Sequence, residues 1–423
     1  MTDEREIGSG PHPPAVRTLV ICPTICPGGG PPGYTYNLRA GLAELVDDPE
    51  LGATAGGVRF LGIELGTRNR ATGAAPADLR EAPNRPASAR LAAGTRAAAR
   101  RLSPRAAWRR ARKTLKRWRT IAGADIVVFQ GYQPAAEARW ARRAGKTVIY
   151  MPHSPSIFAD EVRMMRALTG SDQPVGDSEH RALQNKERAL FAAADVVVFP
   201  TAHAVEPYKD AFGEVLASRR VAYVLSGVEP PAIADTTGAG PDALFSEATT
   251  NVLFVGRYVP HKGYDLFLDA AERLTGEGVD AAFWTLGDGP LKRPSRSVTD
   301  LGWRDAPHAV IAQADIIVVA NRTAYFDLLP LEAAALGRGL VLTRVGGNID
   351  QLELLPDSVG SEPDALAEAV RAAIALRRAS AAWGQQNAEA FHREFTHVHM
   401  ARRWASLIAD VASSRRDRRS RRR

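Results

Sequence analysis

Short apolar runs rich in Val and Ile alternate with helix-length segments along most of this 423-residue sequence, and this alternation restricts the fold more than any other feature. One series of runs lies within residues 16–227, and a second lies within residues 251–345. Continuous apolar strands separated by helices are typical of parallel sheets that helices cover on both faces. The sequence therefore predicts an α/β protein of two Rossmann-like lobes with a cleft between them.

The segment between the two series sets the domain boundary. Residues 226–250 are rich in Pro, Gly and Thr, and we interpret them as a linker. We therefore place the first lobe at residues 1–230 and the second at residues 231–390. Residues 66–123 break the alternation with a stretch rich in Ala, Arg and Pro, which predicts an insertion in the first lobe.

The net charge of +8 is concentrated in two segments. Residues 68–119 hold 16 Lys and Arg against two acidic residues, and residues 414–423 hold seven Arg against one. Since the rest of the chain is acidic, we expect an anionic partner near these segments rather than over the whole surface. No nucleic-acid-binding motif is present, so we do not expect that partner to be nucleic acid.

One part of the insertion has the pattern of an amphipathic helix. Within residues 104–120, apolar side chains recur at helical intervals, at Trp108, Ala111, Leu115 and Trp118. Arg and Lys surround this face, as they do in helices that lie in the interface of an anionic membrane. Two hypotheses stay open: the helix docks the first lobe on such a membrane surface, or its tryptophans pack onto the lobe and its arginines face water.

Several kinds of anchor and site are not expected. No apolar run reaches the roughly 18 residues that span a membrane. The first residues lack the pattern of a secretory signal, so we expect a cytoplasmic protein, with peripheral attachment to the inner face of the membrane as the added hypothesis. The two cysteines, Cys22 and Cys26, indicate neither a disulfide framework nor a zinc site. No Asp-rich motif follows a predicted strand, so we expect neither a metal nor another cofactor.

The strongest local motif follows the first predicted strand of the second lobe. Gly256 and Arg257 end that strand, and Lys262 and Gly263 begin the next helix. Arginine can bind two phosphate oxygens at once and lysine adds a point charge, so this pair suits a diphosphate. The alternative is a solvated loop with ordinary surface cations. Because the chain holds only 7 Lys against 48 Arg, Lys262 carries more of the argument than Arg257.

A glycine-rich loop also follows the first predicted strand of the first lobe, before a helix that contains Gly30 and Gly33. Glycines let a backbone approach a ligand closely, and a helix N-terminus favours an anion. The spacing does not fit the dinucleotide fingerprint, because Pro31 and Pro32 occupy the turn. A tight turn without a ligand is an equal alternative.

Several stretches occur in a recognisable order along the chain. They are GRYVPHKGYDLFLDA (256–270), LGDGP (286–290), LGWRDAPHAVIAQADIIVVANR (301–322) and LLPLEAAALGRGLVLTRVGGNID (328–350). In this order they resemble glycosyltransferase family 4, whose members are retaining enzymes of the GT-B fold. The resemblance implies that a C-terminal helix, placed at residues 391–412, crosses back onto the first lobe. We expect the Arg-rich tail beyond it, at residues 413–423, to be disordered.

The resemblance also implies roles for individual residues. Arg257 and Lys262 would hold the donor diphosphate and stabilise charge on the leaving nucleotide. Glu332 would bind the ribose hydroxyls, and His153, at the end of a predicted strand, would touch the donor sugar. The remaining predicted donor-binding positions are Gly30, Gly33, Gly256, Gly287 and Leu331.

The chain departs from the family pattern at the position eight residues before Glu332, where an acidic residue is expected and Ala324 stands. Asp327 supplies a displaced carboxylate in one interpretation and caps a helix in the other. Residues 291–297 are too short for the helix usual at this place, so the second lobe is predicted to be trimmed. Asp350 stands where the family usually has glutamate.

Together these features predict a retaining, hexosyltransferase-like enzyme. It would move a sugar from a nucleotide-diphosphate-sugar donor, which we expect the second lobe to hold, to an acceptor hydroxyl, which we expect the first lobe to hold. The alternative, prompted by Ala324, is a glycosyltransferase-like binding or partner subunit with impaired catalysis. The sequence does not indicate the donor base, the sugar or the acceptor.

Overall fold

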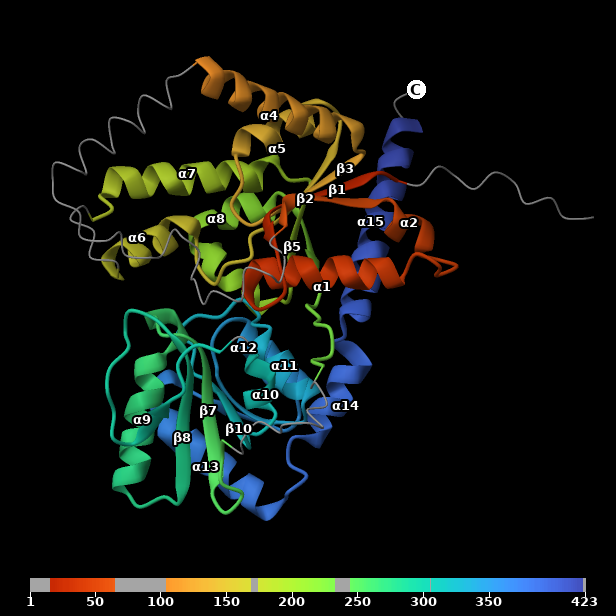
Figure 1. The fold of residues 1–423 in the computed structure, drawn as a ribbon. Helices are drawn as coiled ribbons and strands as arrows, with labels where there is room; N and C mark the ends of the chain where they lie inside the picture. The colour runs from red at the N-terminus through yellow and green to blue at the C-terminus, as the bar shows by residue number, and fades with distance from the viewer. Residues whose placement is uncertain (1–15, 65–103, 169–173, 233–243, 305, 421–423) are drawn as a thin grey trace, which may run out of the picture.

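The computed structural model describes residues 16–64, 104–168, 174–232, 244–304 and 306–420. They form two α/β lobes, one above the other in Figure 1, each built on a six-stranded sheet. All strand pairs in both sheets are parallel. The predicted α/β fold with two parallel sheets is therefore confirmed.

The first sheet has the strand order β2-β1-β3-β4-β5-β6. Its central strands are buried, apart from the partly buried Thr147, because apolar residues occupy both of their faces. The strands are β1 (Thr18–Ile25), β2 (Val58–Glu64), β3 (Ile126–Gln130), β4 (Thr147–Met151), β5 (Val196–Phe199) and β6 (Arg220–Tyr223). The helices of this lobe are α1 (Gly30–Glu44), α2 (Gly52–Gly56), α4 (Pro104–Gly123), α5 (Ala135–Arg143), α6 (Phe158–Leu168), α7 (Asp177–Ala193), η2 (His203–Val205) and α8 (Glu206–Ala217).

The second sheet has the strand order β12-β11-β10-β7-β8-β9. Its strands are β7 (Thr250–Arg257), β8 (Ala281–Asp288), β9 (Val298–Asp300), β10 (Ile316–Val319), β11 (Gly339–Thr343) and β12 (Ser358–Ser361). Its helices are η3 (Pro260–Lys262), α9 (Tyr264–Gly276), α10 (Pro307–Ile311), α11 (Leu329–Ala335), α12 (Gly347–Leu354), η4 (Pro363–Ala365) and α13 (Leu366–Ala379). Because all strand pairs are parallel, the carboxyl ends of the strands in each sheet lie at a common edge, where ligands bind in such folds.

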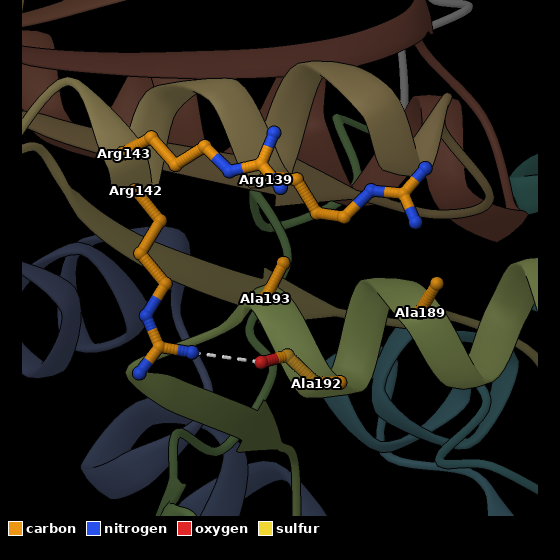
Figure 2. A pocket seen from close by; sticks show the side chains of 6 residues that line it. All are labelled: Arg139, Arg142, Arg143, Ala189, Ala192 and Ala193. Atoms are coloured by element: carbon orange, nitrogen blue, oxygen red, sulfur yellow. Dashed lines mark hydrogen bonds between the residues drawn. The ribbon is translucent and has the colours of Figure 1, made fainter.

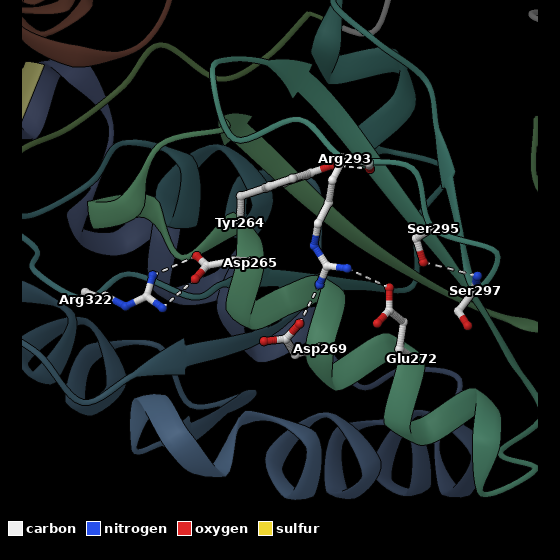
Figure 3. Close-up of polar contacts among 8 residues, drawn as sticks. All are labelled: Tyr264, Asp265, Asp269, Glu272, Arg293, Ser295, Ser297 and Arg322. Carbon is white, nitrogen blue, oxygen red and sulfur yellow. Dashed lines mark hydrogen bonds and ion pairs between the residues drawn. The ribbon is translucent and has the colours of Figure 1, made fainter. Parts of the chain in front are cut away.

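The sequence predicts that the second lobe lacks a helix at residues 291–297, and the structure has a loop there, between β8 and β9. Arg293 holds this loop against α9 through ion pairs with Asp269 at 2.5 Å and Glu272 at 3.1 Å (Figure 3). The hydroxyl of Tyr264 also donates to the carbonyl oxygen of Arg293, at 3.4 Å. Polar contacts with α9 thus hold a loop where the sequence leaves no room for a helix.

Two C-terminal helices, α14 (Gln385–Glu394) and α15 (His397–Ser420), return from the second lobe to the first (Figure 1). Helix α15 packs on α1, where Gly41 allows close approach because a Cβ there would lie 2.3 Å from the carbonyl oxygen of His397. The Trp404 indole donates to the Tyr34 hydroxyl at 2.6 Å.

The expectation of disorder beyond residue 412 is wrong for residues 413–420, which continue α15. Arg415 fixes this end, because it forms an ion pair with Asp125 at 3.1 Å and donates to the carbonyl oxygen of Gly145. Composition alone did not reveal these partners. Residues 421–423 lie outside the described residues.

The basic segment at residues 104–120 is helical, as predicted, and forms most of α4 at the end of the first lobe far from the second (Figure 1). The ring of Trp118 packs edge-on against Trp140 of α5, with ring centroids 4.4 Å apart. Leu115, on the same predicted face, is 52% exposed. The side chains of Trp108 and Ala111 lie outside the described residues. The face therefore packs onto the lobe at one end and is open at Leu115.

Candidate functional site

Two predicted glycines meet where β7 and β8 end. Gly256 and Gly287 are register partners, and their φ angles are +149° and +153°. A Cβ on Gly287 would lie 1.9 Å from the carbonyl oxygen of Gly256. The N–H of Gly287 donates to the carbonyl oxygen of Gly302, which brings the turn after β9 alongside. Both glycines thus shape the strand ends, and their contact with a donor stays a prediction.

The two predicted cations flank the next turn. Arg257 ends β7 with an exposed side chain that forms no ion pair with any described residue. Lys262 ends η3, and its Nζ lies 2.5 Å from Oδ2 of Asp327. The chain then turns into α9 through Gly263, where the carbonyl oxygen of Ala320 would clash with any Cβ, at 1.8 Å. At this edge of the sheet, Arg257 therefore has no ion-pair partner among the described residues, whereas Asp327 neutralises the charge of Lys262.

Asp327 is held as an ionised carboxylate. Its Oδ2 also accepts a hydrogen bond from the Asn321 amide at 2.8 Å. Burial alone would raise the pKa of Asp327, but the charge of Lys262 and these hydrogen bonds outweigh it, so the pKa lies below its ordinary value. Helix α11 has Leu328 at its N-cap and no side-chain cap. The interpretation of Asp327 as a helix cap is therefore wrong.

The loop from Asn321 to Leu328, which connects β10 to α11, is tied down on both sides. Arg322 forms a two-pronged ion pair with Asp265 of α9, with both contacts at 2.7 Å (Figure 3). On the other side, the Gln351 amide of α12 donates to the carbonyl oxygen of Asp327 at 2.8 Å. These contacts fix the position of the carboxylate beside Lys262.

Helix α11 carries two predicted donor-binding residues with different surroundings. Glu332 keeps a 15% exposed side chain whose Oε2 lies 3.5 Å from Nε2 of His308. Leu331 is fully buried in the core, and its N–H already donates to the carbonyl oxygen of Leu328. The Leu331 side chain does not reach the surface in this structure, and its donor-binding role stays a prediction.

His153 follows β4 in the first lobe and is the one non-glycine residue with positive φ, at 61°, in the part of the chain that the structure describes. Its Nε2 is buried without a hydrogen-bond partner. Burial lowers the pKa of His153 to about 3, so the ring is neutral at physiological pH. A strained backbone and an unsatisfied ring nitrogen are features that cluster at functional sites.

The glycine-rich loop of the first lobe leads into α1. Gly30 has φ +70° and open space around it, since the nearest atom to a Cβ there would be Cδ of Pro32, at 4.0 Å. Gly33 has no such room, because a Cβ would lie 1.4 Å from the carbonyl oxygen of Gly28. Pro31 and Pro32 lie in the first turn of α1, where proline is favoured. The tight turn is thus present, and a donor-binding role for Gly30 and Gly33 stays a prediction.

The two lobes touch at these strand ends. The Tyr325 ring lies between His153 and Phe199 of the first lobe, with ring centroids 6.2 and 6.3 Å away. Nearby, Nδ1 of His203 lies 2.9 Å from Oδ1 of Asp350 in α12. The structure therefore brings Lys262 and Asp327 together in the second lobe, and brings their loop against His153 in the first.

Buried polar atoms without hydrogen-bond partners gather at the same place. Eight of them lie in segments that directly follow a strand of either sheet. They belong to His153, Thr201, His261, Asn321, Tyr325, Asn348, Asp350 and Gln351. Unsatisfied buried polar groups are rare in folded proteins, so such a concentration indicates a place that binds a polar ligand.

Sequence reasoning missed Tyr325, Asn321 and His308. No sequence signal distinguished Tyr325 or Asn321, because their significance depends on contacts across space. His308 stands beside Pro307 at the start of a short helix, a position that gives no indication of its contact with Glu332.

Other features lie outside this site. A shallow groove of about 230 Å³ between α5 and α7 is lined by Arg139, Arg142 and Arg143 (Figure 2). It adjoins the amino ends of the strands, opposite to the site. No group of three or more His, Cys, Asp or Glu side chains is arranged to hold a metal ion within the described ranges. No described helix is long and apolar enough to cross a membrane.

Comparison with known proteins adds family information. Residues 249–375 match the family described as Glycosyl transferases group 1. The chain is 28% identical to D-inositol 3-phosphate glycosyltransferase of Geodermatophilus obscurus over 275 residues, which are 59% of this chain and 60% of that relative. The chain thus spans less than two thirds of the length of this curated relative.

Solved structures show the fold over nearly the whole chain. Sucrose-phosphate synthase of Thermosynechococcus elongatus superposes with a TM-score of 0.59 and 16% identity, covering 94% of this chain and 99% of the other. HepE of Anabaena, in complex with UDP, superposes with a TM-score of 0.54 and 14% identity, covering 93% and 100%. The GT-B fold and the resemblance to glycosyltransferase family 4 are therefore confirmed.

Proposed function

We propose that this chain is a retaining glycosyltransferase, which moves a sugar from a nucleotide-diphosphate sugar to an acceptor hydroxyl. The observation that carries the proposal is the edge where Arg257 and Lys262 stand beside the Gly256–Gly287 pair, next to the loop whose Tyr325 contacts the neutral His153. The family match over residues 249–375 and the UDP named in the HepE structure support it.

The mechanism follows from the charges at this edge. Arg257, without an ion-pair partner among the described residues, and Lys262 would bind the diphosphate and stabilise the charge that develops as the nucleotide leaves. Glu332 would accept hydrogen bonds from the ribose hydroxyls. The acceptor hydroxyl would attack the anomeric carbon from the face that the diphosphate leaves, which retains configuration. The bond between the sugar and the diphosphate breaks, and the hydroxyl proton passes to the departing phosphate oxygen. Fixed geometry supplies much of such an acceleration.

Before a donor binds, the carboxylate of Asp327 neutralises the charge of Lys262 at this edge. That carboxylate occupies Lys262, so a donor phosphate must share or replace that contact. A carboxylate this close to the leaving group is also placed to orient the acceptor hydroxyl, which is our proposal for the displaced acid. We further propose that the cations at this edge make a metal ion or other cofactor unnecessary.

A second candidate function rests on Ala324. This residue is 1% exposed, and its carbonyl oxygen accepts the N–H of Gly347 at 3.2 Å, so no carboxylate reaches the site from this position. A glycosyltransferase-like subunit that binds a donor without transferring it would fit this loss. Turnover of any nucleotide sugar by the purified chain eliminates this candidate.

The test is a thermal-shift screen of nucleotide sugars, since a donor that binds only the folded chain raises Tm by an amount that grows with the ratio of its concentration to its Kd. The donor that binds is then assayed for transfer in the wild type, in Arg257→Ala and in Arg378→Ala. Arg378 is an exposed arginine of the same lobe that pairs with Asp280, and it serves as the matched control. The proposal requires turnover that falls in Arg257→Ala and persists in Arg378→Ala. Equal rates in the two variants contradict it.

We also propose that α4 docks a cytoplasmic enzyme on the inner, anionic face of the membrane. Lys116 and Arg119 are exposed beside Leu115, whereas Trp118 is engaged with Trp140. Each cation near an anionic leaflet contributes about 1 kcal/mol. Co-sedimentation with anionic and neutral vesicles at low and high salt tests this: Leu115→Ser should weaken binding to anionic vesicles alone. Recovery in the supernatant under all conditions contradicts it.

A further inference from the structure

Glu187 of α7 is a buried acidic residue that the proposed site does not use. It is 2% exposed and forms no ion pair with any residue that the structure describes. Its Oε2 accepts a hydrogen bond from the N–H of Phe158, the first residue of α6, at 2.8 Å. Because a buried carboxylate without a cation is costly, its presence here requires an explanation.

The titratable groups that face Glu187 come from the elements packed around it, and among the described residues none of them is a cation. They are Asp160 and Glu161 of α6, Tyr132 after β3, Tyr150 of β4 and Tyr208 of α8. The two basic neighbours of Glu187 on α7 do not compensate it. Lys186 is exposed, and Arg188 donates to the carbonyl oxygen of Ala211 in α8 at 2.6 Å.

The proton of Glu187 is lost near neutral pH. Burial raises the pKa of Glu187 to about 7. The hydrogen bond from Phe158 opposes this rise, and the charges of Glu161 and Asp160 add to it. The carboxyl group therefore changes its charge in a range where an ordinary glutamate is already ionised.

Helix α6 has little else that is buried to hold it in place. Ala159 is its one buried residue. Its other polar contacts with α7 are ion pairs with at least one exposed partner, at Asp160–His180, Arg163–Asp177 and Arg166–Glu179. Since exposed pairs contribute little, the contact of Phe158 with Glu187 carries much of the attachment.

The attachment of α6 matters because residues 154–157 join it directly to His153. The Tyr208 hydroxyl donates to the carbonyl oxygen of Ser154 at 2.7 Å, and the Ser154 hydroxyl donates to Glu161 of α6 at 3.2 Å. Figure 1 shows α6 on the side of the first lobe that faces the second lobe. A movement of α6 therefore changes the segment that follows His153.

We propose that Glu187 is a positioning residue, whose protonated side chain holds α6 and residues 154–157 in place and whose ionisation releases them. Ionisation puts a negative charge beside Asp160 and Glu161, and water solvates this charge only when α6 moves away. The segment beside the site is thus ordered in weakly acidic solution and loosened in alkaline solution. This inference goes beyond the proposed function and holds whether or not the chain transfers a sugar.

The test is hydrogen–deuterium exchange of the α6 amides in the full chain at pH 5 and pH 8, with protection factors corrected for the intrinsic exchange rate. Glu187→Gln keeps the shape and an oxygen that accepts from Phe158, but it cannot ionise. With α6 open, Glu187 titrates at its ordinary pKa of 4.5, and with α6 closed it titrates at about 7. Opening of the wild type therefore becomes easier as pH rises from 4.5 to 7, and changes no further above 7.

We expect the protection of α6 in Glu187→Gln, relative to the wild type, to rise by about tenfold or more from pH 5 to pH 8. A merely structural contact gives a ratio that does not change with pH, and that outcome overturns the inference. A ratio that falls with pH overturns it as well. The pair of His180 with Asp160 is present in both proteins, so the pH-dependence that it adds cancels in the ratio.

Glu179→Gln is the matched control, because it makes the same change on the same helix in a residue that pairs with Arg166 of α6. The hydrogen bond from Arg166 lowers the pKa of Glu179, so this carboxylate is ionised at both pH values. Its loss should reduce the protection of α6 by a similar factor at pH 5 and pH 8. A ratio that changes with pH as much for Glu179→Gln as for Glu187→Gln contradicts the assignment to Glu187.

Discussion

The two lobes share one architecture and differ in the chemistry at their strand ends. The second lobe presents charge: Arg257, and Lys262 paired with Asp327. The first lobe presents buried neutral groups: His153 with its unsatisfied Nε2, and Gln130, whose Oε1 accepts from a threonine hydroxyl at 2.7 Å. Under the proposed function, each edge would suit a different part of one ligand: the second lobe would hold the diphosphate and the first lobe would surround uncharged groups.

The largest effect that tests this division is expected from Lys262→Ala. Loss of one fixed charge beside a leaving diphosphate commonly costs about 100-fold or more in turnover. In this structure the change also leaves the Asp327 carboxylate, whose side chain is only 23% exposed, without its cation, so the free energy of unfolding falls as well. Turnover at saturating donor and denaturant unfolding separate the two effects.

The double variant Lys262→Ala, Asp327→Asn serves as the control for this prediction. It removes both charges, so stability should recover toward the wild type while turnover stays low. Lys292→Ala, which breaks the exposed pair with Asp300 in the same lobe, should affect neither quantity strongly. Full activity of Lys262→Ala at saturating donor contradicts the assignment of charge to the second lobe.

The two lobes also differ in how closely their backbones pack around glycines at the strand ends. Gly287→Ala should lower the free energy of unfolding by about 3 kcal/mol or more, because the new Cβ meets the carbonyl oxygen of Gly256 at 1.9 Å and φ is +153°. Gly30→Ala in the first lobe should cost only about 1–2 kcal/mol, because its φ of +70° is strained for alanine but the surrounding space is open. Urea unfolding of both variants measures the difference. Equal losses of unfolding free energy in the two variants would contradict the expected difference in packing around Gly287 and Gly30.

The sequence predicted those features that depend on residues close together in the chain. The Val and Ile runs, the Gly256–Gly287 strand ends and the cations at Arg257 and Lys262 are local patterns, so they indicated the two sheets and the charged edge. Tyr325 and His308 gained their meaning from neighbours that are distant in sequence, and no local pattern indicated them.

Two of the wrong predictions have related causes. Arg-rich composition indicated a disordered tail, but the contacts of Arg415 with Asp125 and Gly145 give α15 a place to pack. The position of Asp327 before a helix suggested a cap, but the approach of Lys262 directs its carboxylate elsewhere. In both cases a long-range ion pair outweighed a local preference.

Asp327→Asn tests whether sugar transfer and stability depend on the carboxylate of Asp327 in the second lobe. If Asp327 orients the acceptor, transfer should be lost while donor binding persists. The pKa of Asp327 is lowered in the folded state, so its pair with Lys262 stabilises fully above the unfolded value of about 3.9 and is lost as pH falls through the folded pKa. The variant should therefore be less stable at neutral pH, by about 1–3 kcal/mol, and converge on the wild type in acid. Transfer at the wild-type rate by Asp327→Asn contradicts the catalytic role.

The smallest expected effect concerns the contact that joins the two regions, the pair between His203 of the first lobe and Asp350 of the second. The hydrogen bond to Asp350 raises the pKa of His203, against the opposing effect of burial. A raised folded pKa means that the pair stabilises fully below the unfolded value of about 6.5 and is lost as pH rises through the folded pKa. Since the His203 side chain is 35% exposed, solvent screening limits the contribution to under about 1 kcal/mol.

Thermal unfolding at pH 6 and pH 8.5 measures this contribution. His203→Ala should lower Tm at pH 6 and match the wild type at pH 8.5, because the wild type has lost the pair by then. His180→Ala is the control, since His180 pairs with Asp160 at 2.6 Å inside the first lobe and does not join the lobes. The discriminating quantity is the difference in Tm between pH 6 and pH 8.5, to which only the pair of His203 with Asp350 contributes a contact between the lobes. The same pH-dependence of Tm in His203→Ala and the wild type would contradict this prediction. It would show that the pair of His203 with Asp350 does not stabilise the contact between the lobes, which α15 and the uncharged contacts of Tyr325 would then provide.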